Sequence, residues 1–423
     1  MARAEDAAGA AAGTDTTAGR PRRTAPPPPP DDRRPVVIAA RRTAVGRAGG
    51  VLAGIELSGL LATVIRGVLA DARADPALVD DVVVGNAAGG GGNPARLAAL
   101  EAGLPVGVPG VTVDRQCGSG LEAIVLACRL VTAGAGELYL AGGGESVSTA
   151  PWRVSPPARP GALPRFYARA RFAPDSVGDP DMGVAAENVA AAFGVSRRRQ
   201  DEFALRSHRR AVDARRKGRF TGEVVPVVTA GGEVTEDECP RPGTSLAALA
   251  ALPPVFAPEG TVTAGNSCPL NDGASMVVVT SVAAARRLGH VRGLGFVDAA
   301  TAGVHPNLLG VGPVAATRRL VARNPGLDPG SVDRVEFNEA FAAQVLASLD
   351  ALGIDPEGVN RDGGALALGH PYGASGAILV TRLFSQLVRD PCPGLPSPGG
   401  RGLAMLGIAG GLGITALFES WAW

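Results

Sequence analysis

The stretch "PALVDDVVVGNA" at residues 76–87 returns in altered form as "PGSVDRVEFNEA" at residues 329–340. Both copies begin with a proline and continue into a short valine-containing run that is typical of a buried strand. A repeat at one fixed spacing predicts two duplicated α/β halves within the chain. The identical pairs, all 253 positions apart, are Pro76/Pro329, Val79/Val332, Asp80/Asp333, Val82/Val335 and Ala87/Ala340.

Other apolar runs extend this pattern along the chain. They alternate with stretches rich in Ala, Leu and Arg that have helical periodicity, and such alternation predicts buried parallel strands in an α/β fold. The runs are "PVVIAA" (35–40), "VDDVVVG" (79–85), "ELYLAGGG" (137–144), "SMVVVTS" (275–281), "VDRVEFN" (332–338) and "LAMLGIAGG" (403–411).

The composition of each region predicts the domain organisation. Residues 1–34 end in "TAPPPPPDDRR" and are expected to be a disordered leader. Residues 35–150 together with 256–288 form the expected N-terminal half, and residues 289–423 form the C-terminal half. Between them, residues 151–255 are rich in Pro and Arg and predict an inserted loop domain for carrier binding and oligomer contacts, with a polar helix from about 196 to 217.

Charge and cysteine content exclude several classes of function. The chain of 423 residues has a net charge of +1 and 19% charged residues, so no nucleic-acid partner is expected, and no apolar run is long enough for a membrane span. The five cysteines, at positions 117, 128, 239, 268 and 392, include no C-x-x-C pair. We therefore expect free thiols in a reducing cytoplasm and no metal site.

Cys117 is a candidate nucleophile. It precedes two glycines and an apolar helical run in "QCGSGLEAI" (116–124), and a helix N-terminus stabilises a thiolate. A buried thiol that only packs is the alternative. The repeat spacing of 253 places Cys117 opposite His370, in the glycine-rich turn "ALGHPYGASGAI". Two equivalent turns facing each other would pair a thiol with a general base.

Competing motifs fail. The run "GNAAGGGGNPARL" (85–97) lacks the GK[ST] of a P-loop, and neither a dinucleotide fingerprint, a G-x-S-x-G elbow nor an H-E-x-x-H pair occurs. We expect structural roles for His208, His290 and His305. The basic helix at 196–220 predicts a solvated face, with binding of a carrier's phosphates as the alternative.

With Cys117, Asn338 and His370 in place, the sequence from about Pro35 to Glu419 resembles the thiolases, acetyl-CoA C-acyltransferases with a duplicated five-layer α-β-α-β-α fold. The resemblance rests on long segments. They are "QCGSGLEAI", "GDPDMGVAAENVA" (178–190), "EGTVTAGNSCPLNDGAS" (259–275), "VEFNEAFAAQ" (335–344) and "NRDGGALALGHPYGASGA" (360–377).

The resemblance implies a ping-pong reaction on acyl-CoA. Cys117 would take the acyl group while His370 activates the thiol. Asn338 would fix a water that forms one oxyanion hole with His370, and the backbone N–H groups of Cys117 and Ala409 would form the second. A second acyl-CoA would then lose its α-proton and attack, which gives acetyl-CoA + acyl-CoA = 3-oxoacyl-CoA + CoA.

One departure affects this second step. The family takes the α-proton with a cysteine in a C-I-G-G-G segment, but the segment here is "GIAGG" (407–411), so Gly407 leaves the position vacant. Loss of a positioned base costs roughly 10² to 10⁴ in rate. Some thiolases have their second cysteine in the segment that corresponds to "NEAF" (338–341), but the residue at that position here is Ala340, so this segment provides no thiol either. Cys268 is a candidate displaced acid/base, with a packing thiol as the alternative.

Further departures concern the carrier. Asp181 replaces a histidine of the pantetheine tunnel and Ala248 replaces a serine near the adenine, whereas Arg241 is kept. The implied carrier-binding residues are Met182, Arg241, Ala264 and Cys268. CoA thioester is the expected substrate, with an acyl-carrier-protein thioester as the alternative, no permanently bound cofactor, and a homodimer or homotetramer as the assembly.

Two other functions stay open at this point. Acyl transfer or thioester hydrolysis would need no carbon deprotonation and would tolerate Gly407. A non-catalytic, acyl-CoA-binding partner with a thiolase shape would need no reactive thiol at all, although Cys117, Asn338 and His370 are all present.

Overall fold

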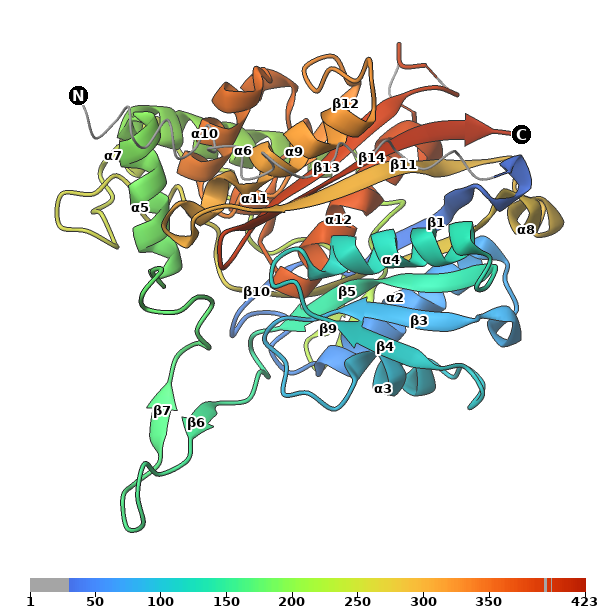
Figure 1. The fold of residues 1–423 in the computed structure, drawn as a ribbon, viewed down its shortest axis with the longest axis horizontal. Coiled ribbons are helices and arrows are strands. Elements are labelled where there is room, and N and C mark those ends of the chain that lie inside the picture. Colours follow the sequence, from blue (N-terminus) through green and yellow to red (C-terminus); the bar gives the residue numbers. More distant parts are fainter. Residues whose placement is uncertain (1–29, 392–393, 397) are drawn as a thin grey trace.

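The computed structural model describes residues 30–391, 394–396 and 398–423 (Figure 1). The expected leader therefore lies outside the described residues up to position 29. From Pro30 the chain forms one short 3-10 turn, η1 (Asp31–Arg33), and enters the first strand at Pro35. Among the described helices, none has the length and apolar character needed to cross a bilayer.

The N-terminal half of the main sheet has the strand order β1-β10-β5-β3-β4. Pairing is antiparallel between β1, β10 and β5, and parallel between β5, β3 and β4. A short strand, β2, pairs with the start of β10. The bounds are β1 (Pro35–Arg42), β2 (Gly46–Arg47), β3 (Asp81–Gly85), β4 (Gly110–Val113), β5 (Leu138–Ser146) and β10 (Asn271–Ser281).

The C-terminal half repeats this arrangement in the order β11-β14-β13-β12. The pairing senses also match, because β11–β14 and β14–β13 are antiparallel and β13–β12 is parallel. Antiparallel pairing of β1 with β11 joins the two halves. The predicted duplication is thus confirmed in the strand order. The bounds are β11 (Arg292–Gly303), β12 (Arg334–Phe337), β13 (Arg401–Ile408) and β14 (Leu412–Ala422).

The prediction of parallel strands was wrong for β1 and β10 and for the pairing of β13 with β14. All six predicted apolar runs are strands, but a continuous apolar run reports burial on both faces and carries no information on strand direction. Helices cover both faces of each half, so antiparallel strands are buried here as completely as parallel ones.

Three apolar cores define five layers. The central core packs α4 and α12 between the two halves of the sheet, as Figure 1 shows for α12. The second core packs α2 and α3 on the outer face of the N-terminal strands, and the third packs α9 and α10 on the outer face of the C-terminal strands. The bounds are α2 (Leu57–Ala72), α3 (Pro94–Glu101), α4 (Ser119–Ala133), α9 (Gly312–Arg323), α10 (Ala342–Leu352) and α12 (Tyr372–Phe384).

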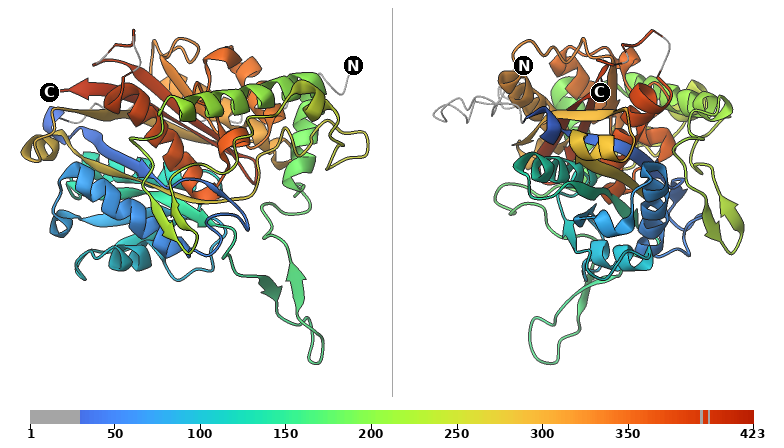
Figure 2. Two further views of the ribbon diagram at one scale, coloured as in Figure 1. Left: turned by 180° about the vertical axis from the view of Figure 1, so that it is seen from behind. Right: turned by 90° about the vertical axis from the view of Figure 1, so that its right-hand side faces the viewer.

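The region between the halves contains a protruding hairpin and a helical part. The hairpin of β6 and β7 extends away from the body (Figures 1 and 2). The predicted polar helix is confirmed as α6. The elements are β6 (Arg153–Ser155), β7 (Arg165–Tyr167), α5 (Met182–Phe193), α6 (Arg197–Arg216), β8 (Val227–Thr229), β9 (Gly232–Val234) and α7 (Leu246–Ala250).

Short elements complete the described chain. They connect the strands and the larger helices at the surface and around the turn that precedes α12. They are η2 (Pro76–Leu78), α8 (Val282–Arg287), η3 (Pro306–Val311), η4 (Pro356–Gly358), α11 (Ala365–Leu368) and the π-helical η5 (Ser385–Arg389).

The repeated aspartates make equivalent contacts. The Asp80 carboxylate accepts hydrogen bonds from the backbone N–H groups of Glu137 and Leu138, at 2.7 and 2.9 Å, where β5 begins. Asp333 accepts a bond of 2.8 Å from the N–H of Arg401, where β13 begins. Each aspartate thus fixes the start of the strand next to its own, which explains why the repeat retains it.

Glycines bring α4 and α12 into direct backbone contact. A methyl group at Gly120 would lie 2.5 Å from the carbonyl oxygen of Gly373, and one at Gly376 would lie 2.4 Å from the backbone nitrogen of Leu121. Both distances are shorter than any ordinary carbon contact. Gly120 and Gly373 are themselves 253 positions apart, so the two halves touch at equivalent positions.

We predict that Gly120→Ala lowers the free energy of unfolding by about 1–3 kcal/mol, because the added methyl group separates two closely packed helices. Urea denaturation measures the change. Gly107→Ala is the matched control, since no atom lies within 4 Å of its added methyl group. Equal stability of the two variants would contradict the contact.

Candidate active site

The Cys117 turn is held by its own polar groups. Gln116 has a left-handed backbone with φ of 46°, and α4 starts at Ser119. The Ser119 hydroxyl accepts a hydrogen bond of 2.8 Å from the N–H of Arg115 and donates one of 2.6 Å to the carbonyl of Gln116. Such strain in a non-glycine residue is characteristic of functional turns.

The His370 turn is its equivalent in the second half. Gly369, which corresponds to Gln116, has φ of 112° and ψ of 165°, a conformation open essentially only to glycine. The backbone N–H of His370 donates to Asn271 Oδ1 at 2.8 Å. Helix α12 starts two residues after His370, just as α4 starts two residues after Cys117.

The His370 ring is held through Nδ1, which lies 2.6 Å from Ser375 Oγ, and this oxygen also lies 3.2 Å from the carbonyl oxygen of Pro371. With the Ser375 proton on that carbonyl, Nδ1–H donates to Ser375. This leaves Nε2 unprotonated, 3.4 Å from Asn338 Nδ2. Burial lowers the pKa of His370 to about 4, which keeps the imidazole neutral and able to accept a proton at neutral pH.

Backbone groups face the Cys117 sulfur. Burial raises the pKa of the Cys117 thiol to about 11, although the N–H groups of Ala409 and Cys117 act to lower it. The backbone donors do stabilise a thiolate, as the sequence predicts, but the loss of hydration outweighs them and the resting group is a thiol. Among the described residues, no hydrogen bond joins the sulfur to the His370 ring.

A cavity of about 820 Å³ opens at Cys117. Its wall also contains Ala409, Met182 and Tyr372, and the hairpin of β6 and β7 contributes Phe166 and Tyr167. Deep beside it, the buried Glu145 carboxylate accepts bonds from the N–H groups of Ala87, Ala88 and Gly373. Glu145 thereby ties the N-terminus of α12 to the loop after β3.

The sequence matches known families over almost all of its described length. The family model "Thiolase, N-terminal domain" matches residues 35–283, and "Thiolase, C-terminal domain" matches residues 294–420. The chain belongs to the thiolase family. This assignment makes it an acyltransferase and confirms the five-layer fold expected from the sequence.

Individual relatives of this thiolase support the same assignment. "Putative acetyl-CoA C-acetyltransferase VraB" of Staphylococcus epidermidis is 46% identical over 383 residues, which cover 90% of this chain and 97% of that protein. The protein of the same name from Staphylococcus aureus is 46% identical over 380 residues, or 89% and 97% of the two chains. The acetyl-CoA acetyltransferase crystal structure from Bacillus anthracis superposes with a TM-score of 0.83 at 34% identity, covering 92% of this chain and 99% of that one.

The predicted carrier-binding residues of the thiolase chain divide between two cavities. Met182 lines the cavity at Cys117, whereas Arg241 and Ala264 line a separate cavity of about 220 Å³. Asp181 is engaged by Arg169 at 3.0 Å, and Ala248 lies in α7, where its N–H donates to Ser245. The resemblance to thiolases was the only reason to expect these residues in one carrier-binding site. In the structure, Met182 lines one cavity and Arg241 and Ala264 line another.

Cys268 lies near the nucleophile but outside the wall of its cavity. Its N–H donates to the carbonyl of Ala340 at 3.0 Å. Burial raises the pKa of the Cys268 thiol, and the nearby Cys117 raises it further. Cys268 is therefore a neutral thiol at neutral pH.

Gly407 lies buried near the end of β13. A methyl group there would lie 3.1 Å from the carbonyl oxygen of Gly310 and 3.4 Å from Gln344 Nε2. The amide of Gln344 donates to that same carbonyl at 3.3 Å. A Cβ at this position would therefore require its neighbours to shift by a few tenths of an ångström.

The other three histidines have structural contacts. His208 Nδ1 accepts from the N–H of Arg241 at 3.2 Å, and His305 Nδ1 accepts from that of Asn307 at 3.2 Å. His290 Nε2 lies 3.0 Å from the carbonyl of Ala72. Each of the three rings thus contacts the backbone of its own surroundings, and their structural roles stay a prediction.

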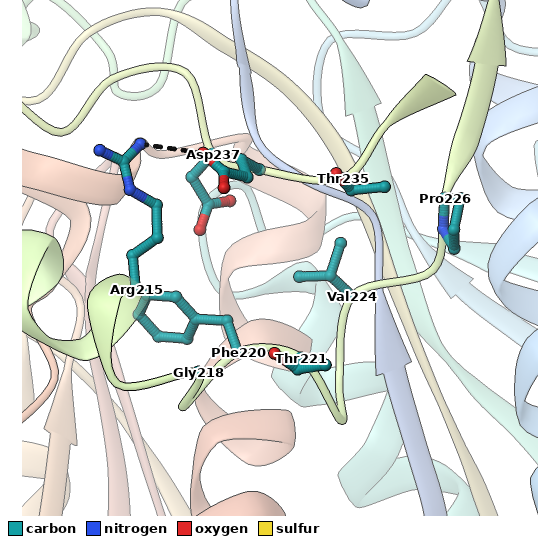
Figure 3. A pocket seen from close by; sticks show the side chains of 9 residues that line it. Arg215, Gly218, Phe220, Thr221, Val224, Pro226, Thr235 and Asp237 are labelled. Atoms are coloured by element: carbon teal, nitrogen blue, oxygen red, sulfur yellow. Dashed lines mark ion pairs between the residues drawn. The ribbon is translucent and has the colours of Figure 1, made fainter. Parts of the chain in front are cut away.

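A further cavity, of about 410 Å³, lies between the end of α6 and the segment before Asp237 (Figure 3). Arg215 borders it and forms an ion pair of 3.3 Å with Glu236. Asp237 is itself paired with the buried Arg42. None of the predicted site residues lines this cavity.

Sequence reasoning missed three residues around His370. Asn271 and Ser375 hold its backbone and ring, and Tyr372 lies edge-on to the ring with a centroid distance of 5.2 Å. Ser375 and Tyr372 stand within the glycine-rich motif that identified His370. Both residues follow His370 closely, at the start of a predicted helix, and this spacing could have indicated that their side chains lie near the imidazole.

We predict that the alkylation rate of Cys117 by iodoacetamide rises steadily with pH from 7 to about 9.5. A thiol with a pKa of about 11 is mostly protonated throughout this range, whereas an ordinary thiol with a pKa near 8.5 would level off. Mass spectrometry of the modified peptide measures the rate, and Cys117→Ser identifies signal from other thiols. A rate that levels off by pH 9.5 would contradict the raised pKa of the Cys117 thiol.

Proposed function

We propose that this chain accepts an acyl group from an acyl-CoA on Cys117 and then makes or cleaves a 3-oxoacyl-CoA. One observation carries the proposal: a thiol and a neutral imidazole occupy equivalent helix starts, and the helices touch through Gly120 and Gly373. The names of the relatives support acetyl-CoA as one substrate.

In the first half of the reaction, the Cys117 sulfur attacks the thioester carbonyl while its proton passes to His370 Nε2. Because thiol and imidazole are both neutral at rest, proton transfer accompanies attack as general base catalysis. The tetrahedral oxygen would take its negative charge between the N–H groups of Cys117 and Ala409. Loss of CoA leaves an acyl-Cys117 thioester.

In the second half, the carbonyl of another acyl-CoA would lie against the Asn338 amide and the His370 ring, with one water completing the oxyanion site. The pair is set for this role by the 3.4 Å contact between Asn338 Nδ2 and Nε2. Donors fixed before the reaction stabilise an enolate without reorganisation. Attack of the enolate on acyl-Cys117 forms the 3-oxoacyl-CoA.

A second candidate function follows from Gly407. Acyl transfer or hydrolysis from acyl-Cys117 needs no carbon deprotonation, and the segment at 407–411 provides no thiol for that step. Both functions proceed through the same acyl-Cys117 intermediate and differ only in the group that then accepts the acyl group. For either one, CoA is the proposed carrier and the cytoplasm the proposed compartment, since Cys117 and the other three described cysteines are free thiols.

We predict that wild-type protein gains the mass of one acetyl group on Cys117 when it is incubated with acetyl-CoA. Cys117→Ala should form no adduct, whereas Cys128→Ala should retain it, because Cys128 is buried in the core of α4. Intact-mass and peptide mass spectrometry measure the result. No adduct on the wild-type protein would contradict both candidate functions and favour a non-catalytic acyl-CoA-binding role.

To distinguish the two candidate functions, the acyl-enzyme must be offered a second substrate. Carbon–carbon bond formation predicts acetoacetyl-CoA from two acetyl-CoA molecules, or acetyl-CoA from acetoacetyl-CoA and CoA. An adduct that forms without either product would assign the protein to acyl transfer or hydrolysis.

A further inference from the structure

Making a carbon–carbon bond requires a group that accepts the α-proton of the second acyl-CoA. Around Cys117, the side chains that could accept a proton are Asp114, Glu145, Tyr167, Cys268, His370 and Tyr372. Two of them are already engaged, because Asp114 accepts from the N–H of Gln116 at 2.6 Å and Glu145 accepts from three backbone N–H groups. His370 holds the Cys117 proton at this stage, and Tyr167 stands on the protruding hairpin with 41% of its surface exposed. Cys268 and Tyr372 are therefore the buried groups that remain.

Tyr372 has the better position of the two. It lines the same cavity as Cys117 and Ala409, whereas Cys268 does not reach that wall. Its ring stands edge-on to His370, at an interplanar angle of 85°. Among the described residues, no hydrogen-bond partner engages the phenol oxygen, which is thus available to a substrate.

The duplication shows that Tyr372 is not required to build its turn. Ser119 occupies the equivalent position in the first half, and its hydroxyl holds the Cys117 turn through two hydrogen bonds. In the second half this task falls to Ser375, which bonds to Pro371 and to the His370 ring. The Tyr372 side chain therefore does not have the structural role that Ser119 has in the first half.

We propose that Tyr372 is the acid/base that removes the α-proton, in place of a side chain at Gly407; this inference rests on the proposed function. As the first thioester C–S bond breaks, the Tyr372 hydroxyl gives its proton to the CoA sulfur and becomes a phenolate. The phenolate then takes the α-proton of the second acyl-CoA. The released electron pair forms the new carbon–carbon bond, the bond to Cys117 breaks, and the sulfur recovers its proton from His370.

The electrostatic surroundings suit this sequence. Burial raises the pKa of the Tyr372 phenol, and the nearby thiols raise it further, so the resting group is a proton donor. Once His370 has accepted the Cys117 proton its ring is a cation, and because the centroids of the two rings are 5.2 Å apart, this charge favours the phenolate form of Tyr372. The phenolate remains a stronger base than a thiolate, which matches a weakly acidic α-carbon.

Deuterium exchange tests Tyr372 directly. Acetyl-CoA is incubated with the protein in D₂O, and mass spectrometry follows both the α-deuterium content of acetyl-CoA and the acetyl adduct on Cys117. Tyr372→Phe keeps the ring against His370 and removes only the hydroxyl. We expect exchange to fall by roughly 10² to 10⁴, the usual contribution of a positioned base, and adduct formation to slow by less than about tenfold, because CoA can also leave as a thiolate.

Controls separate the outcomes. Tyr139→Phe removes another phenol, in the central core away from the cavity, and should leave exchange unchanged. If Tyr372→Phe retains the exchange, the inference is overturned. If Cys268→Ala in addition loses the exchange, the step belongs to Cys268. A wild-type adduct without any exchange would also overturn it. An absent wild-type adduct would instead refute the proposed function itself.

Discussion

The backbone contact between α4 and α12 is the constraint on which the rest of the structure depends. Gly120 and Gly373 occur at equivalent positions of the two halves, and a single methyl group at Gly120 would collide with the opposite carbonyl. Only this close approach brings both helix starts to the same cavity region. The sheets on either side, with their matching strand order, hold the two helices in that relation.

Burial then decides the electrostatics of the site. Removal from water raises the pKa of Cys117 to about 11 and lowers that of His370 to about 4, so the neutral pair is the resting state. A neutral thiol is protected from adventitious oxidation and alkylation, and it becomes nucleophilic only as a base accepts its proton. Such a site depends on the precise placement of proton acceptors, which the Ser375 and Asn271 contacts provide for His370.

The sequence predicts much of this because the repeat carries physical constraints. Asp80 and Asp333 recur since each fixes the start of a neighbouring strand, and the same spacing leads from Cys117 to His370. Strand direction was not predictable, because apolar runs encode burial only. The raised thiol pKa depends on the depth of the cavity, and the exposure of Tyr372 to it depends on how α12 meets α4. Both are tertiary properties that no local pattern records.

The most direct test is a crystal structure of the wild-type protein cooled shortly after exposure to acetyl-CoA. The account predicts an acetyl group bonded to Cys117 Sγ, with its carbonyl oxygen between the N–H groups of Cys117 and Ala409 and with Tyr372 facing the open side. An unmodified Cys117 with acetyl on another residue would contradict it. So would an acetyl carbonyl directed away from both N–H groups.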